Sequence, residues 1–183
     1  MVWNNRQSSS SPKPKYLFHA SQKSDIDLLE PRAGSVRDPN EGPVVFATPS
    51  LPYATMFLVN SDDSWTVKGR INKVFYTVIS DKQRFLQADK GGTIYTLPSQ
   101  TFYCDPEKGM GWNEWVSKEP VKPIKRQHYQ SGLQAMIDSG VQVYFVDKQT
   151  FQEIKKSQDH GFSILQSIQS ENQRLNKNVL LFG

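Results

Sequence analysis

The apolar positions of this chain fall into short runs separated by polar segments that are rich in Gly and Pro. Short runs bounded by turn residues are typical of β-strands. The predicted strands cover residues 16–21, 44–48, 65–69, 73–80, 91–98, 112–124 and 141–147. Both faces of the strand over 73–80 are apolar, so we expect it to be central in its sheet. Pro120 and Pro123 place a bend or a sheet edge in the segment over 112–124.

Helical spacing of apolar residues appears in the intervals between some of these strands. Thr48 and Pro49 form a capping hydroxyl followed by proline, which predicts a short helix with Leu51, Ala54 and Leu58 on one face. Further helices are predicted over 81–87, over 126–139 and from 148 towards the end, with an interruption near His160. The helix over 126–139 is predicted from the stripe Tyr129, Leu133, Met136 and Ile137 and from Gly140 after it.

Strands outnumber helices, and the first strands are not separated by long crossover helices. This order favours an α+β fold with a mixed, mostly antiparallel sheet over a doubly wound parallel sheet. The chain has 183 residues, a length that makes one domain the default. We expect a flexible polar tail over 1–15, an α+β domain over 16–155 and a C-terminal helical segment over 156–183.

Composition narrows the function classes only slightly. The net charge is +4, so a nucleic-acid partner is permitted but not indicated. Cys104 is the one cysteine and there are three histidines, which makes a zinc site improbable and suits a reducing compartment. No apolar run is long enough to span a bilayer and no signal peptide is evident, so the expected location is the cytoplasm.

Four short patches carry candidate chemistry, and their order in the chain is informative. The first strand ends in His19-Ala20-Ser21, and the second ends in Phe46-Ala47. A helix with Tyr53 and Phe57 follows, and a late segment carries Asn113-Glu114 between two tryptophans. This order resembles the ADP-ribosyltransferase superfamily, in particular its diphtheria-toxin and poly(ADP-ribose) polymerase branch, and it implies that family's split β-sheet fold.

The resemblance implies that the chain acts on NAD, as a substrate, and transfers ADP-ribose to an unknown macromolecular acceptor. Glu114 corresponds to the essential glutamate, and His19 to the histidine that positions a ribose. The backbone of Ala20 would hold the nicotinamide amide, with Ser21 beside it. Tyr53 or Phe57 would stack on the nicotinamide ring. Arg32 and Arg37, in the loop after the first strand, are candidates for contacting the pyrophosphate.

Two alternatives remain open from the sequence. A non-catalytic module that binds a protein or nucleic acid would explain why Ala20 replaces the family's glycine and Val45 its aromatic residue. An RNA 2′-phosphotransferase would share the architecture and also use NAD, but the chain has few histidines for that reaction. The sequence indicates neither the acceptor nor the oligomeric state.

Overall fold

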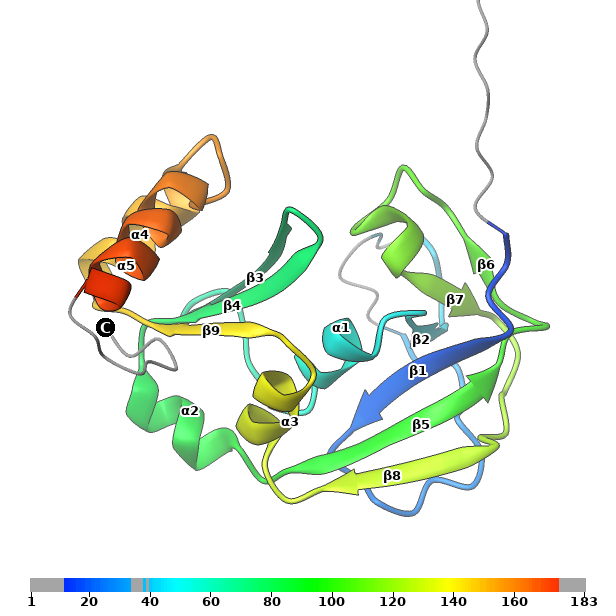
Figure 1. The fold of residues 1–183 in the computed structure, drawn as a ribbon. Helices are drawn as coiled ribbons and strands as arrows, with labels where there is room; N and C mark the ends of the chain where they lie inside the picture. Colours follow the sequence, from blue (N-terminus) through cyan, green and yellow to red (C-terminus); the bar gives the residue numbers. More distant parts are fainter. Residues whose placement is uncertain (1–11, 34–37, 39, 175–183) are drawn as a thin grey trace, which may run out of the picture.

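The computed structural model describes residues 12–33, 38 and 40–174, and it confirms the α+β fold class in a single domain. Residues 1–11 of the predicted tail, and Arg37, lie outside the described residues. Five α-helices and nine strands are described, and Figure 1 shows their arrangement. The strands are β1 Tyr16–Ser21, β2 Val45–Ala47, β3 Thr66–Ile71, β4 Val74–Ile79, β5 Gly92–Pro98, β6 Tyr103–Cys104, β7 Trp115–Ser117, β8 Lys125–Tyr129 and β9 Gln142–Phe145. The helices are α1 Leu51–Thr55, α2 Lys82–Ala88, α3 Gly132–Asp138, α4 Lys148–Lys156 and α5 Phe162–Arg174, with a 3₁₀ turn at Gly111–Asn113.

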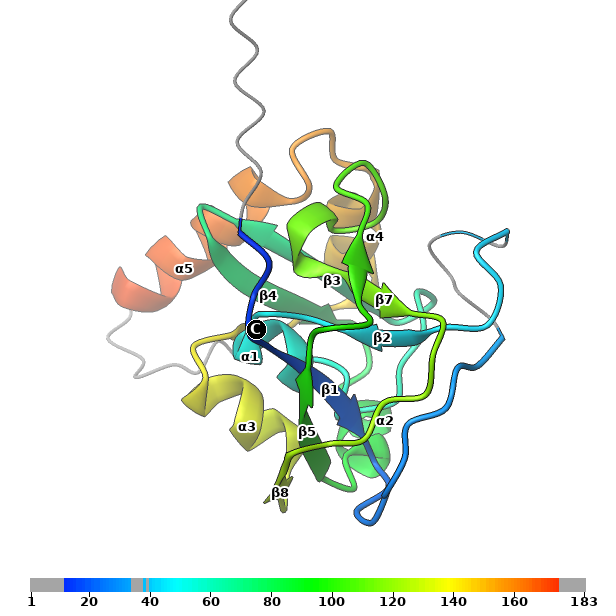
Figure 2. The same ribbon diagram turned by 90° about the vertical axis from the view of Figure 1, so that its right-hand side faces the viewer.

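The strands form three small sheets in the orders β1-β5-β8, β2-β7-β6 and β3-β4-β9. All pairings are antiparallel except that between β4 and β9, which is parallel. An isolated antiparallel bridge between Phe18 and Thr48 connects the first two sheets. Strand β2, which ends just before Thr48, pairs with β7 and lies near β1 (Figure 2). The mixed, mostly antiparallel strand arrangement predicted from the sequence is thus confirmed, in the form of three three-stranded sheets.

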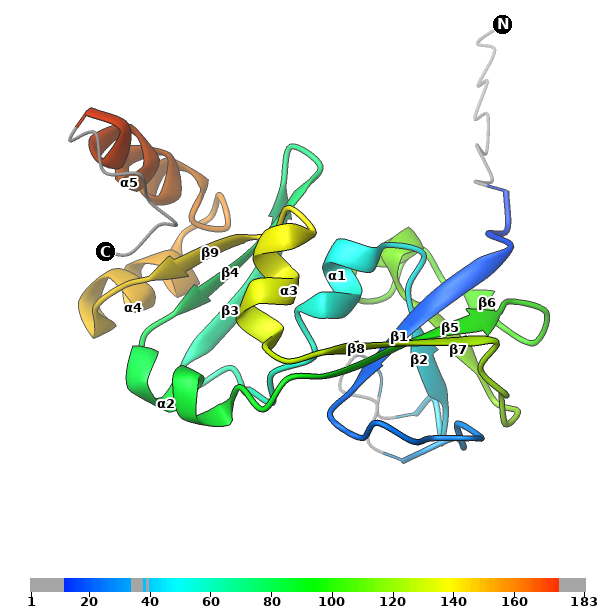
Figure 3. The same ribbon diagram turned by 60° about the horizontal axis from the view of Figure 1, so that its bottom comes forward.

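Helices α1 and α3 lie between the β3-β4-β9 sheet and the β1-β5-β8 sheet, as Figure 3 shows. Strand β4 is central in its sheet, as predicted, and apolar side chains cover both of its faces. Phe75 and Ile79 join a core with Tyr53, Met56 and residues of α2 and α3. Tyr76 and Val78 join a second core with Phe151, Ile154 and Leu165 of the last two helices.

The helix that follows β2 begins later than the sequence indicates. Its N-cap is Ser50, whose hydroxyl oxygen accepts a hydrogen bond from the Tyr53 backbone N–H, and Pro52 occupies the first turn. Thr48 instead belongs to the bridge with β1, because its backbone exchanges two hydrogen bonds with Phe18. The predicted cap at Thr48-Pro49 is therefore wrong by two residues, although the helix and its apolar face are present.

The prediction of one helix over 126–139 is wrong in its first half. Residues 125–129 form β8, which pairs with β5, and α3 begins at Gly132 after the N-cap Ser131. Asp89 fixes that start, because its carboxylate accepts hydrogen bonds from the Gly132 and Leu133 backbone N–H groups and from the Ser131 hydroxyl. The predicted end is confirmed, since Gly140 follows the helix with a φ of 87°.

The segment over 112–124 is only partly a strand. Trp112 and Asn113 belong to the 3₁₀ turn, and Glu114 follows in an extended conformation directly before β7. The helical segment from Lys148 is interrupted at His160 and Gly161, as predicted, and both residues have positive φ. None of the helices among the described residues is long and apolar enough to cross a membrane.

Candidate functional site

A cavity of about 160 Å³ lies beside the C-terminal half of β1 and contains three of the predicted site residues. His19, Ser21 and Arg32 all line it, together with Glu30 and Phe46. The three predicted residues come from β1 and from the loop that follows it. Typical small-molecule sites have volumes of roughly 300–1,000 Å³, so this cavity fits part of a dinucleotide and not the whole.

The hydrogen bond of His19 defines which ring nitrogen is available to a ligand. Its Nδ1 lies 2.7 Å from the backbone oxygen of Phe46, and a carbonyl oxygen only accepts, so Nδ1 donates. Burial lowers the pKa of His19, and the nearby charge of Arg32 lowers it further. The imidazole is therefore neutral at pH 7, which leaves Nε2 as a hydrogen-bond acceptor for a hydroxyl group.

Backbone hydrogen bonds hold the loop that carries Arg32. The Arg32 N–H donates to the Val44 oxygen at 3.1 Å, and the Val44 N–H donates to the Arg32 oxygen at 3.0 Å. Tyr95 fixes the start of the loop, because its buried hydroxyl donates to the Lys23 oxygen and accepts from the Ile26 N–H. Tyr95 also lies opposite His19 in the strand register, a positioning role that the sequence analysis missed.

The backbone N–H and C=O of Ala20 face the edge of β1 that does not pair with β5. Phe18 exchanges its backbone hydrogen bonds with Thr48 on the β2 side. Alternate residues of a strand point their backbone groups to the same side, so the N–H and C=O of Ala20 also face that side. Beyond Thr48 the chain turns into α1. The N–H and C=O of Ala20 therefore face the region between β1 and that helix.

Tyr53 and Glu114, predicted from segments 61 residues apart, are in direct contact. The Tyr53 hydroxyl donates a hydrogen bond of 2.7 Å to Oε1 of Glu114. The other carboxylate oxygen, Oε2, is shielded from solvent. Burial and the adjacent Glu114 carboxylate both raise the pKa of Tyr53, so the phenol keeps its proton and acts as the donor. The hydrogen bond fixes the direction of the glutamate side chain.

The Tyr53 ring itself offers little surface to a ligand. It is 5% exposed, stacks on Phe75 at a centroid distance of 5.0 Å, and meets the edge of Phe57 at 5.1 Å. Phe57 is 44% exposed, so it is the ring of the predicted pair that presents a surface to a flat ligand. Lys68 of β3 lies over the Phe57 ring, with its Nζ 4.7 Å from the centroid.

The predicted residues thus form two groups on either side of the end of β1. Leu17 packs in the same core as Tyr95, and His19 faces Tyr95 and lines the cavity, whereas Phe18 and Ala20 pack against a core that includes Ala54 of α1. Glu114 precedes the Ala47–Trp115 pair of β2 and β7 by one residue, which places its backbone next to Thr48. Two strand spacings of ~4.8 Å then separate the Glu114 and Phe18 backbones, or about 10 Å.

Comparison with known proteins gives no match: no family model fits the sequence, and no curated protein and no solved structure is significantly similar to it. The function must therefore be argued from the chemistry of the site.

Proposed function

We propose that this protein cleaves the nicotinamide–ribose bond of NAD and transfers ADP-ribose to a macromolecular acceptor. The observation that carries the proposal is the Tyr53–Glu114 hydrogen bond, which orients a shielded carboxylate. The Glu114 backbone lies two strand spacings, or about 10 Å, from that of Phe18, and the next residue, His19, lines a cavity that offers a cation and a neutral imidazole. A dinucleotide that passes the Ala20 edge of β1 would contact both groups of residues.

The reaction places positive charge where Glu114 can stabilise it. As the bond between the ribose C1′ and the nicotinamide nitrogen breaks, nicotinamide leaves with the bonding electron pair and the ribose becomes oxocarbenium-like. A fixed carboxylate beside the sugar stabilises this state more than the neutral substrate ribose. The acceptor then forms a bond to C1′ and loses a proton. Tyr53 acts as a positioning residue, because it holds the carboxylate through its hydroxyl.

The cavity residues suit the rest of the dinucleotide. Nε2 of the neutral His19 accepts a hydrogen bond from a ribose hydroxyl, and the Arg32 guanidinium pairs with a pyrophosphate oxygen. Glu30, on the same cavity wall, offers a carboxylate to a second hydroxyl. The N–H and C=O of Ala20, which face the edge of β1 opposite β5, match the carboxamide of nicotinamide, which carries one acceptor and two donors.

Calorimetric titration with NAD, followed by product analysis, tests this proposal. We expect saturable binding, and we expect free nicotinamide and ADP-ribose to accumulate when water is the acceptor. A folded protein that takes up NAD without releasing nicotinamide would instead be a binding module. A protein that neither binds nor consumes NAD would contradict the proposal. If a 2′-phosphorylated RNA is dephosphorylated in the presence of NAD, the RNA 2′-phosphotransferase is the correct alternative.

A further inference from the structure

The β3–β4 hairpin is a positively charged arm beside the candidate site. Between Thr66 and Ser80 the charged residues are Lys68, Arg70 and Lys73, and all three are cations. Arg70 and Lys73 are exposed, and Lys73 lies in the hairpin turn, where Asn72 and Lys73 both have positive φ. Lys68 and Arg70 are two residues apart on β3, so they share one face about 7 Å apart.

Aromatic rings lie between these cations and Tyr53, the residue that donates to Glu114. Lys68 Nζ lies over Phe57, and the Arg70 guanidinium lies 5.6 Å from the centroid of Phe75. Both rings contact Tyr53, whose hydroxyl donates to Glu114. The cationic face of β3 and the half-exposed Phe57 ring therefore border the Tyr53 ring, whose hydroxyl reaches the glutamate.

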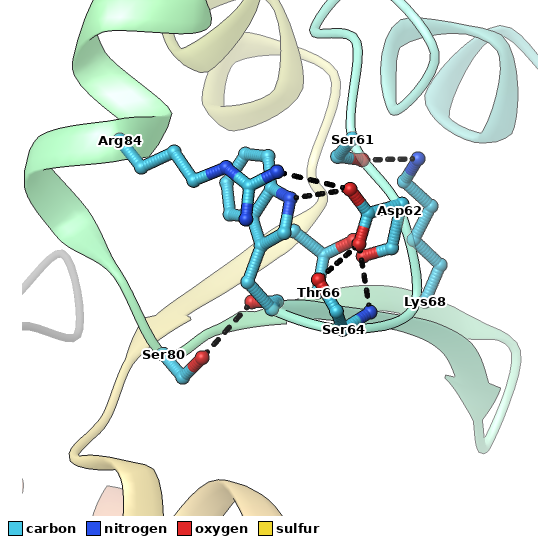
Figure 4. Close-up of polar contacts among 8 residues, drawn as sticks. Ser61, Asp62, Ser64, Thr66, Lys68, Ser80 and Arg84 are labelled. Carbon is cyan, nitrogen blue, oxygen red and sulfur yellow. Dashed lines mark hydrogen bonds and ion pairs between the residues drawn. The ribbon is translucent and has the colours of Figure 1, made fainter.

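Among the described residues, no carboxylate accepts a hydrogen bond from the Lys68 amine, so this amine is suited to binding an external anion. It donates to the neutral hydroxyl of Ser61 at 3.0 Å, as Figure 4 shows, and Asp63 is the carboxylate whose charge acts on it. The neighbouring Asp62 is engaged elsewhere, with Arg84, Trp65 and Ser64. Burial lowers the pKa of Lys68 to about 8, and a bound anion would offset that cost.

We propose that this face of the β3–β4 hairpin binds a single-stranded nucleic acid and presents it to Glu114 as the ADP-ribose acceptor. The inference rests on the proposed function and names its acceptor class. Cations spaced along a strand match successive phosphates of an extended single strand, and an exposed aromatic ring beside them provides a surface on which a base stacks. The pyrophosphate of NAD has a separate cation, Arg32, in the cavity beside His19.

Fluorescence anisotropy with labelled single-stranded DNA and RNA of about 20 nucleotides, longer than the ~4–16 nucleotides of common sites, tests this inference without NAD. The variants are Arg70→Gln/Lys73→Gln, which changes only exposed residues, and the triple variant that adds Lys68→Gln. The matched controls are Lys118→Gln/Lys122→Gln and the triple variant that adds Lys125→Gln, all exposed and outside the hairpin. Thermal unfolding of each variant confirms that it is folded.

We expect the hairpin variants to bind about tenfold more weakly or worse, with the slope of log K against log salt reduced by about 1–2. The control variants should stay within about twofold of the wild type. The inference is overturned if the wild type does not bind, if the controls lose as much affinity, or if polyglutamate competes better than an oligonucleotide of equal charge. It is also overturned if the hairpin variants lose NAD binding to the same degree. Nicotinamide release in water reports on the proposed function separately, so the two failures are distinguishable.

Discussion

The Tyr53 hydroxyl donates to Oε1 of Glu114 across 2.7 Å, and this bond joins α1 to the segment before β7. Tyr53 lies in the short helix α1 and Glu114 lies just before β7, and a backbone hydrogen bond anchors each residue. The backbone N–H of Tyr53 donates to the Ser50 cap, and the N–H of Glu114 donates to the Gly111 oxygen at 2.9 Å. The Tyr53 hydroxyl thus helps to fix the direction of the carboxylate, and the backbones of both residues are held in place.

Replacing Tyr53 by Phe removes that bond while keeping the ring. We expect Tyr53→Phe to lower the free energy of unfolding by about 1–3 kcal/mol, because Oε1 of Glu114 loses the donor that Tyr53 provides. We also expect kcat for nicotinamide release to fall about ten- to hundredfold, with KM changed less, because the glutamate is no longer oriented. Urea unfolding and steady-state kinetics measure the two effects. Wild-type values for both would mean that the hydrogen bond positions nothing.

The lowered pKa of His19 predicts a pH dependence of stability. The unfolded imidazole gains its proton below its ordinary pKa of 6.5, whereas the folded one stays neutral to lower pH because it is buried. The unfolded state then binds more protons, so the free energy of unfolding falls as the pH drops below 6.5 and levels off below the folded pKa. His19→Asn keeps a donor to the Phe46 oxygen and removes this titration. Urea midpoints measured from pH 7.5 to pH 4.5 should fall less in the variant, and parallel curves would contradict the assignment.

Arg32→Gln separates the electrostatic role of Arg32 from its ligand role. Loss of the positive charge should raise the pKa of His19, because Arg32 contributes to lowering it, and NMR titration of the ring protons measures this without any ligand. We expect the same variant to bind NAD about ten- to hundredfold more weakly, the effect of one charged hydrogen bond. Lys122→Gln is the control for net charge. An unchanged His19 titration would show that the guanidinium does not face the imidazole.

Lys68 should react with amine reagents before other lysines. With a pKa of about 8, the Lys68 amine is neutral in about half of the molecules at pH 8, whereas an ordinary lysine is neutral in less than about 1% of them. Brief acetylation at pH 8, followed by mass-spectrometric peptide mapping, should find Lys68, whose Nζ lies over the half-exposed Phe57 ring, among the most rapidly modified positions. Prior addition of single-stranded DNA should protect it. Uniform labelling of all lysines, unaffected by DNA, would contradict both the lowered pKa and the docking face.

Local signals predicted much of the fold. The first strand is predicted with its exact bounds because polar segments bracket a compact apolar run, and β4 is recognised as central because both faces are apolar. The helix over 126–139 is wrong because its first residues pair with β5, more than thirty positions earlier in the chain. That pairing, and the Asp89 carboxylate that starts α3, are non-local contacts that no periodicity reveals.

For the candidate site, too, the sequence predicted local features but not the contacts between distant segments. The types of its residues, and their order along the chain, were visible in the sequence, but their mutual placement was not. Tyr53 or Phe57 was expected to stack on the nicotinamide ring, whereas the Tyr53 ring is enclosed by Phe57 and Phe75 and its hydroxyl reaches Glu114. Lys68 gave no signal at all, because a single lysine in a strand is ordinarily a solvated one.

The most direct measurement of the central claim is nicotinamide release from NAD by the wild type, by Glu114→Gln and by Glu119→Gln, whose exposed carboxylate serves as the matched control. Each protein is incubated with saturating NAD, and free nicotinamide is quantified over time by chromatography. We predict that Glu114→Gln lowers kcat by about 100-fold or more while its unfolding midpoint stays near that of the wild type, and that Glu119→Gln is unaffected. Equal release by the wild type and Glu114→Gln, or none by the folded wild type, would contradict the account.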